Sequence, residues 1–259
     1  MADSQKFLPV LGAALAIAAG PVWGDLVPIS QNRQVDASGT AQVGNVVDLQ
    51  AGSTSAPDFS LFNAVVDPLA VAVGGGQVAI AQGVASQISS LNLKSVLAQG
   101  TTSVGLTLTP PTGGAATASA NSVFQYEFTL TVPSNYWLTG LVDTVAVVTG
   151  GAALPIFSNN VLFEDLGQAS ILFDSATFDE AFSLSGVLDP GTYRLSASAS
   201  VMGSQLSDAT TSRTVTGISS FEFDFKTKNL PESNTTAASI VLGALGGISW
   251  LRRRRASTR

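Results

Sequence analysis

The chain of 259 residues contains neither histidine nor cysteine. A Ser-His-Asp triad, a cysteine nucleophile and the usual zinc ligand sets are therefore excluded, and there is no disulfide framework. Stability must come from a packed core, for which roughly 200 residues are sufficient. These absences favour a protein that is not an enzyme.

Charge is also scarce, at 12% of the chain. Between Asp25 and Asn229 there are 6 basic and 16 acidic residues, which gives this part of the chain a net charge of −10. Phosphate binding needs a basic surface, so the composition argues against a nucleic-acid partner. Abundant serine, threonine, glycine and alanine are typical of a surface or matrix protein built from strands and turns.

Two acidic couplets, Glu164-Asp165 and Asp179-Glu180, are the nearest approach to the paired carboxylates of a glycosidase. Neighbouring residues on a strand point to opposite faces, so neither couplet can act as a pair by itself. Calcium is a candidate structural ion, because loop carboxylates are its preferred ligands. The spacing matches no known calcium loop, so no residue is assigned to a metal; the carboxylates considered are Asp165, Asp174, Asp179 and Asp189.

An apolar segment near the C-terminus, residues 236–251, is followed directly by four arginines: Arg252, Arg253, Arg254 and Arg255. As a helix the segment spans about 24 Å, just short of the roughly 30 Å core of a bilayer. The arginines would stay on the cytoplasmic side and act as a membrane stop, so everything before Leu230 would lie outside.

A short box of Pro231, Glu232 and Ser233 precedes this segment. Box, apolar segment and arginine cluster together resemble the PEP-CTERM sorting signal, a bacterial tag that an exosortase recognises. Ser233 stands where that family usually has proline. The resemblance implies an exported bacterial protein that is held transiently in the inner membrane, cut at the box and released to the cell surface or the extracellular matrix.

Two other interpretations of the tail stay open. Residues 230–234 are a near miss to the Leu-Pro-x-Thr-Gly tag of sortase substrates, with Asn234 in place of the glycine. A plain C-terminal anchor without processing is the second alternative.

The N-terminus agrees with export. Lys6 precedes an apolar run at residues 7–19, which is too short to span a membrane stably, and small residues follow up to Gly24. This order is typical of a secretory signal peptide; an uncleaved anchor is the alternative. We therefore expect a signal peptide at 1–24, an exported domain at 25–229 and a sorting signal at 230–259. The secretion machinery and an exosortase are the expected partners.

Apolar and polar residues alternate in three stretches, 124–132, 193–201 and 221–225. A period of two predicts half-buried antiparallel strands. We expect Phe128, Tyr193 and Phe223 to share one core between two sheets. The turn at residues 189–191 would fix the entry of the second strand.

Shorter strands are predicted at 42–49, 69–73, 77–80, 104–109, 136–141, 143–149, 160–163, 169–173 and 181–184, with a turn at 74–76. Residues 84–97 fit either a short helix or a strand. The pattern predicts an all-β antiparallel sandwich, preferably a jelly roll and alternatively an immunoglobulin-like sandwich.

Residues 128–141 and 186–195 are similar to segments of exported PEP-CTERM proteins, which favours a bacterial extracellular sandwich. We expect a structural or adhesive surface protein, with an exopolysaccharide as a candidate partner. A carbohydrate-binding module is the alternative. Trp137 is out of phase with Tyr136 and Leu138, so it projects to the opposite face. There it would either stack on a sugar or pack in a second core layer.

Overall fold

The computed structural model describes residues 25–110, 113–175, 180–206 and 211–230. These residues form thirteen β-strands and no helix, so within them no helix is available to cross a membrane. The predicted signal peptide and almost all of the predicted sorting signal lie outside the described residues. Their assignments stay predictions.

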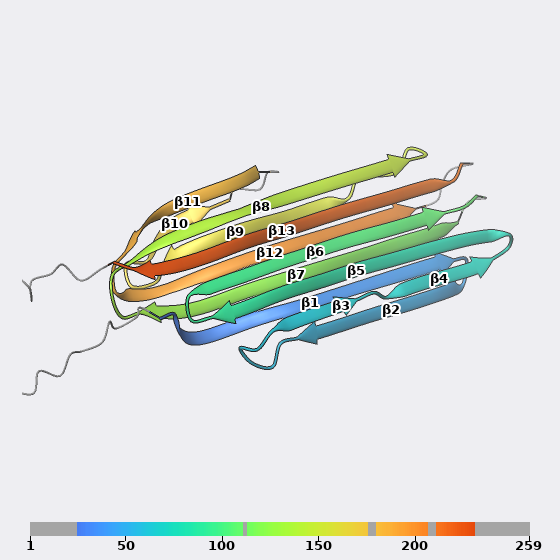
Figure 1. Ribbon diagram of the computed structural model, residues 1–259. Helices are drawn as coiled ribbons and strands as arrows, with labels where there is room; N and C mark the ends of the chain where they lie inside the picture. Colours follow the sequence, from blue (N-terminus) through green and yellow to red (C-terminus); the bar gives the residue numbers. More distant parts are fainter. Residues whose placement is uncertain (1–24, 111–112, 176–179, 207–210, 231–259) are drawn as a thin grey trace, which may run out of the picture.

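The strands form two antiparallel sheets that pack face to face (Figure 1). Sheet A has the spatial order β10 (Ser170–Asp174), β9 (Ile156–Asp165), β12 (Gly191–Leu206), β7 (Gly114–Leu130), β1 (Val27–Val43), β2 (Val46–Ser55). Sheet B has the order β11 (Glu180–Leu188), β8 (Ser134–Thr149), β13 (Arg213–Asn229), β6 (Ser95–Leu108), β5 (Gln77–Asn92), β3 (Phe62–Val66), and β4 (Leu69–Gly74) also pairs with β5. The prediction of an all-β antiparallel sandwich is confirmed.

Both ends of the described chain lie at one end of the sandwich, which we call the terminal end (Figure 1). The Leu26 amide donates to the Leu93 carbonyl at 2.6 Å, and the Leu230 amide donates to the Pro133 carbonyl at 3.2 Å. The opposite end, called the distal end, carries glycine turns such as Gly75-Gly76, where both φ angles are positive. The predicted turn at 74–76 is thus confirmed.

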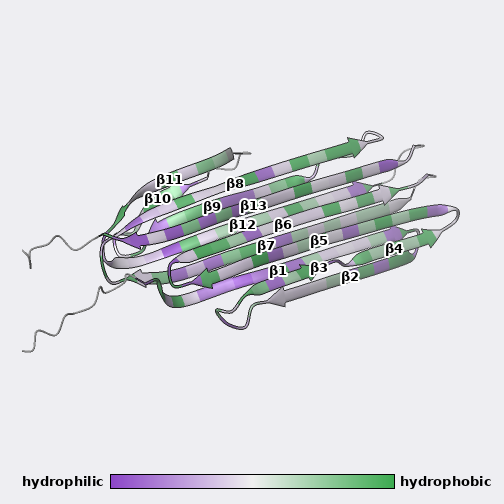
Figure 2. Ribbon diagram, viewed as in Figure 1, coloured by the Kyte–Doolittle hydropathy of each residue, from purple (hydrophilic) through white to green (hydrophobic). Residues whose placement is uncertain are grey.

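Hydrophobic and hydrophilic residues alternate along the long strands, as Figure 2 shows. The inward residues form two clusters. Near the terminal end the cluster is rich in aromatic rings and includes Phe128, Tyr193 and Phe223, which confirms their predicted common core. Phe128 and Tyr193 stack with ring centres 5.8 Å apart. Toward the distal end the second cluster consists mainly of alanine and valine.

The distal cluster allows very close approach of the two sheets. A Cβ atom added at Gly83 on β5 would lie 2.4 Å from the carbonyl oxygen of Ser119 on β7. One added at Gly39 on β1 would lie 2.4 Å from the carbonyl oxygen of Ala81 on β5. Real Cβ atoms cannot approach that closely, so glycine is required at both positions.

The crossover from β2 to β3 is held by Arg33, whose side chain is fully buried. Its guanidinium donates to the Ser60 carbonyl at 2.8 Å and to the Asp58 carbonyl, and lies 5.6 Å from the ring centre of Phe62. Burial lowers the pKa of Arg33, and the charge of Asp58 partly offsets this. The arginine thus satisfies backbone groups of the segment that joins the two sheets at this edge.

Three predicted elements are corrected by the structure. The strand predicted at 42–49 contains the turn between β1 and β2, where Gly44 has a φ of 57°. Of the two alternatives for residues 84–97, the helix is wrong and the strand is right in part: these residues cover the end of β5, a turn and the start of β6. The strands predicted at 136–141 and 143–149 are one continuous strand, β8.

Candidate binding face on sheet A

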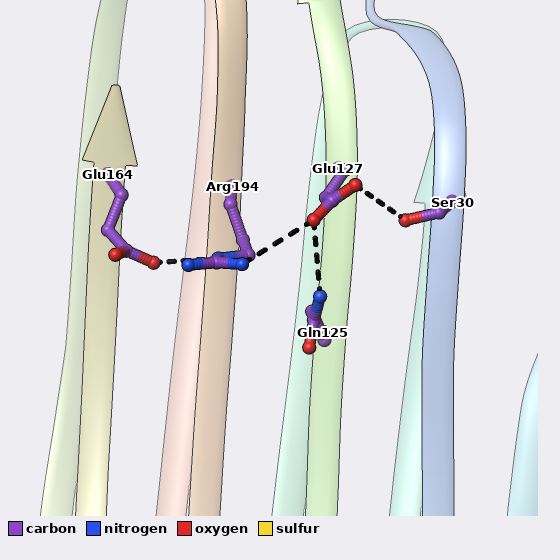
Figure 3. A network of polar contacts seen from close by, with 5 residues as sticks. All are labelled: Ser30, Gln125, Glu127, Glu164 and Arg194. Atoms are coloured by element: carbon purple, nitrogen blue, oxygen red, sulfur yellow. Dashed lines mark hydrogen bonds and ion pairs between the residues drawn. The ribbon is translucent and has the colours of Figure 1, made fainter. Parts of the chain in front are cut away.

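The outer face of sheet A carries a row of polar side chains that crosses four strands near the terminal end (Figure 3). The register places Arg194 of β12 opposite Glu127 of β7 on one side and Glu164 of β9 on the other. Arg194 Nε donates to Glu164 Oε2 at 2.7 Å, and Arg194 Nη1 lies 3.6 Å from Glu127 Oε1. Ser30 and Gln125 also donate to Glu127, at 2.8 and 3.3 Å.

Arg194 determines what this row can do chemically. Its hydrogen bond to Glu164 is the main reason that the pKa of Arg194 is raised, so the guanidinium stays charged. Both glutamates face the same guanidinium, which lies 2.7 Å from Glu164 and 3.6 Å from Glu127. The arrangement is therefore suited to binding and to fixing the sheet surface.

A shallow cavity of about 140 Å³ lies beside this row. Its floor is β12, where the outward side chains are small, Ser196 and Ser198. The register places Gln125 and Leu162 beside Ser196, and Val123 and Asn160 beside Ser198. Larger side chains on β7 and β9 thus form walls on either side of a low central strand.

The lining offers hydroxyl and amide groups together with a little apolar surface. One amide oxygen, Asn160 Oδ1, already accepts from Ser175 Oγ at 3.0 Å. Pockets for drug-sized ligands are typically about 300 Å³ or larger, so this cavity has room for one small polar unit. With Glu127 and Glu164 close by, a neutral ligand such as a sugar ring fits better than an anion.

The sorting residues predicted from the sequence lie outside the described residues: Pro231, Glu232, Ser233, Arg252, Arg253, Arg254 and Arg255. Their assignment is not tested and stays a prediction.

Of the predicted acidic couplets, Glu164 lies on the outer face, whereas Asp165 is 8% exposed and accepts from the Gln168 amide at 3.0 Å. Their predicted opposite orientation is confirmed. Asp179 lies outside the described residues. Across the part of the chain that the structure describes, no group of three or more acidic residues comes together as a metal site.

Trp137 lies on the outer face of sheet B, 43% exposed, while Leu138 is buried. Its projection away from Leu138 is confirmed, and the alternative of a second core layer is wrong. Its neighbours in register are Lys226 of β13 and Ser185 of β11, so it does not line the cavity on sheet A. Stacking of a sugar on Trp137 stays a prediction.

Sequence reasoning missed the contacts around Arg194 and the buried Arg33. Alternation places Glu127 and Arg194 on the wet faces of their strands, and it does not place Glu164. It does not say which strands are neighbours, and that information is needed to bring the three together.

Comparison of the chain with protein-family models, with curated proteins and with solved structures finds no match. The functional inference therefore depends on the residues and the geometry alone.

Proposed function

We propose that this chain is an exported, non-enzymatic protein of the cell surface or extracellular matrix, and that an exosortase removes its C-terminal tail. The observation that carries the proposal is the order of the tail: Pro231-Glu232, an apolar segment at 236–251, and four arginines. It is supported by the position of the domain boundary. The last strand, β13, ends at Asn229, so the box follows the folded domain directly.

The length of the sandwich indicates how an anchored chain would extend from the membrane. Seventeen residues of β13 run from the distal end to the terminal end, a length of about 55 Å. An anchored chain would hold its terminal end near the membrane and project its distal glycine turns outward. Such a body suits a structural or adhesive role, with an exopolysaccharide as the candidate matrix partner.

The tail is tested with two variants of the full chain in cells that contain an exosortase. Replacing all four arginines by glutamine should give protein that is exported but neither retained in the membrane nor correctly cut, because each charge costs about 2.5–3.5 kcal/mol to place in the bilayer. Glu232→Gln should leave retention intact and block cutting only. Fractions of membrane and medium are probed with an antibody against the domain.

Cells without the exosortase provide the control, and there the unaltered chain should stay uncut in the membrane. If the arginine variant is retained and cut like the unaltered chain, the tail is not a membrane stop. Cutting that requires a sortase instead of the exosortase would support the sortase-tag alternative.

A carbohydrate-binding module is the second candidate function, favoured by the cavity on sheet A with its hydroxyl and amide lining. Saturable binding of the chain to a neutral glycan, lost in Ser198→Leu and kept in Ser200→Leu, would support it. Ser198 lines the cavity, while Ser200 is the next outward position on β12.

We also propose that the sandwich is a jelly roll in preference to an immunoglobulin-like fold, because β6, β7, β8 and β9 alternate between the two sheets along the chain.

A further inference from the structure

Three of the four lysines of the chain lie together at the terminal end of the sandwich, on the side of sheet B: Lys94, Lys226 and Lys228. Lys226 and Lys228 are outward residues at the end of β13. Lys94 is in the turn between β5 and β6, and its carbonyl accepts from the Thr227 amide at 2.9 Å. The lysines therefore lie where the described chain ends.

Exposed apolar side chains accompany them. Trp137 is the register neighbour of Lys226 on the outer face, with 43% of its surface exposed. Leu93 in the turn and Leu97 on β6 are 58% and 42% exposed. We call the six residues the Trp-Lys patch: Leu93, Lys94, Leu97, Trp137, Lys226 and Lys228.

The charge of this patch is opposite to that of its surroundings. Asp224 forms an ion pair with Lys226, and Asp25 lies beside the turn that carries Lys94, because the Leu26 amide donates to the Leu93 carbonyl, so the immediate group holds three positive charges and two negative. The domain as a whole is strongly acidic, at −10 between residues 25 and 229. On the other face of the same end, Glu127 and Glu164 outnumber Arg194. An anionic surface is therefore attracted to the sheet B side of the terminal end and repelled elsewhere.

We propose that the Trp-Lys patch rests on the headgroups of an anionic lipid bilayer and sets the orientation of the domain at the membrane. The inference depends on the proposed function, in which the tail holds the terminal end near the membrane. Tryptophan prefers the membrane interface, where its ring is apolar and its N–H group reaches water. Lysines near a bilayer are attracted by anionic headgroups.

The C-terminal end of the described chain lies close to Trp137. Asn229 of β13 pairs with Ser134 of β8, three residues before Trp137 on the same strand. A tail that enters the membrane after Leu230 would thus keep the bilayer within about three residues, or roughly 10 Å along the strand, of Trp137.

The test uses the full chain with Trp23→Phe and Trp250→Phe, which leaves Trp137 as the sole tryptophan. This protein is reconstituted into phosphatidylcholine vesicles with and without phosphatidylglycerol, both containing lipid brominated near the headgroup. We expect a blue shift of the Trp137 emission and a loss of fluorescence to bromine, both larger in the anionic vesicles.

Replacing Lys94, Lys226 and Lys228 by glutamine should abolish the difference between the two kinds of vesicle. Arg213→Gln is the matched control: Arg213 begins β13 at the distal end, so its replacement removes a hydrogen bond to the Leu206 carbonyl but should leave the difference between the two kinds of vesicle unchanged. Thermal unfolding checks that each variant keeps its fold, and Lys228→Gln alone replaces the triple variant if that one is unstable, with a smaller effect in the same direction.

Trp137 fluorescence that is unquenched in both vesicles, or equally quenched with and without the lysines, would overturn the proposal. Tail cutting is scored separately by mass. If the chain is cut by the exosortase but shows no lysine-dependent quenching, only the proposed membrane contact of the Trp-Lys patch is refuted. If quenching is seen in a chain that is never cut, only the proposed removal of the tail is refuted.

Discussion

The two halves of the core solve the same packing problem with different residues. In the terminal half, aromatic rings fill the space between the sheets; Phe163 and Phe225, for example, lie 5.3 Å apart. In the distal half, alanine, valine and glycine allow the backbones of the sheets to approach each other directly. We therefore expect the stability of the terminal half to be sensitive to loss of side-chain volume, and that of the distal half to gain of side-chain volume.

The largest effect is expected for Phe128→Ala in the terminal half. Phe128 is fully buried, and its ring centre lies 5.5 Å from those of Tyr126 and Phe225. Removing the ring should lower the free energy of unfolding by about 3–5 kcal/mol, because the neighbouring rings cannot collapse into the gap. Urea unfolding of the variant measures the loss.

Thr129→Ala is the control for this site, since Thr129 is the next residue on β7 and faces outward. Its unfolding free energy should change little. Equal losses for the two variants would mean that the period or the register of β7 is misassigned.

Alkaline pH should also act on the terminal half, which holds all three tyrosines. Burial raises the pKa of Tyr126 and of Tyr193 to about 12, from 10 for a free phenol. The unfolded chain therefore loses these protons first. The contribution of these tyrosines to stability should be constant below pH 10 and should fall from pH 10 to 12 by about 1.4 kcal/mol per pH unit for each tyrosine.

Unfolding measured at several pH values, together with the tyrosinate absorbance, checks this. Tyr193→Phe should reduce the alkaline slope without abolishing it, because burial raises the pKa of Tyr126 and Tyr136 as well, and should cost about 0.5–1.5 kcal/mol at pH 8, because the hydroxyl donates to the Asp189 carbonyl at 2.8 Å. A stability that does not change up to pH 12 would contradict the assigned burial.

In the distal half we expect damage from a single added methyl group. Gly83→Ala places a Cβ 2.4 Å from the Ser119 carbonyl oxygen and 2.8 Å from that of Ser38, and both belong to backbone that cannot move cheaply. The unfolding free energy should fall by about 1–3 kcal/mol. A neutral result would mean that the sheets are further apart at this point than the structure indicates.

The smallest effect, of opposite sign, is expected at Gly105 on β6. An added Cβ there meets no atom within 4 Å. Gly105→Ala should be neutral or stabilising by about 0.4–1 kcal/mol, because it restricts the unfolded chain. A loss as large as that of Gly83→Ala would show that the close approach of the sheets does not explain the sensitivity of Gly83, because strand propensity favours alanine over glycine at both positions.

The same comparison explains what the sequence could predict. The strands around Phe128, Tyr193 and Phe223 were recognised because large apolar residues alternate with polar ones. Around Gly39 the inward residues are alanine and glycine and the outward ones serine and threonine, and around Gly83 the outward residues include Ile80 and Val84, so in neither stretch are the inward residues clearly more hydrophobic than the outward ones. The turn at Gly44 was therefore missed.

Strand β8 shows a second reason why strands are hard to predict from this sequence. Its inward residues Leu138 and Val142 are buried, but its outward residues Trp137, Leu141 and Val145 are apolar as well. With apolar residues on both faces the period of two disappears, and one strand was predicted as two. The candidate site was unpredictable for another reason: Glu127, Arg194 and Glu164 become neighbours only through the strand order β7-β12-β9.

The most direct test of the central claim is the intact mass of the protein recovered from the surface or medium of its native host. The account predicts a chain that has lost about the first 24 residues and everything after the Pro231-Glu232 box, leaving the folded sandwich. Recovery of the full-length chain, with its apolar segment and four arginines still attached, would contradict it.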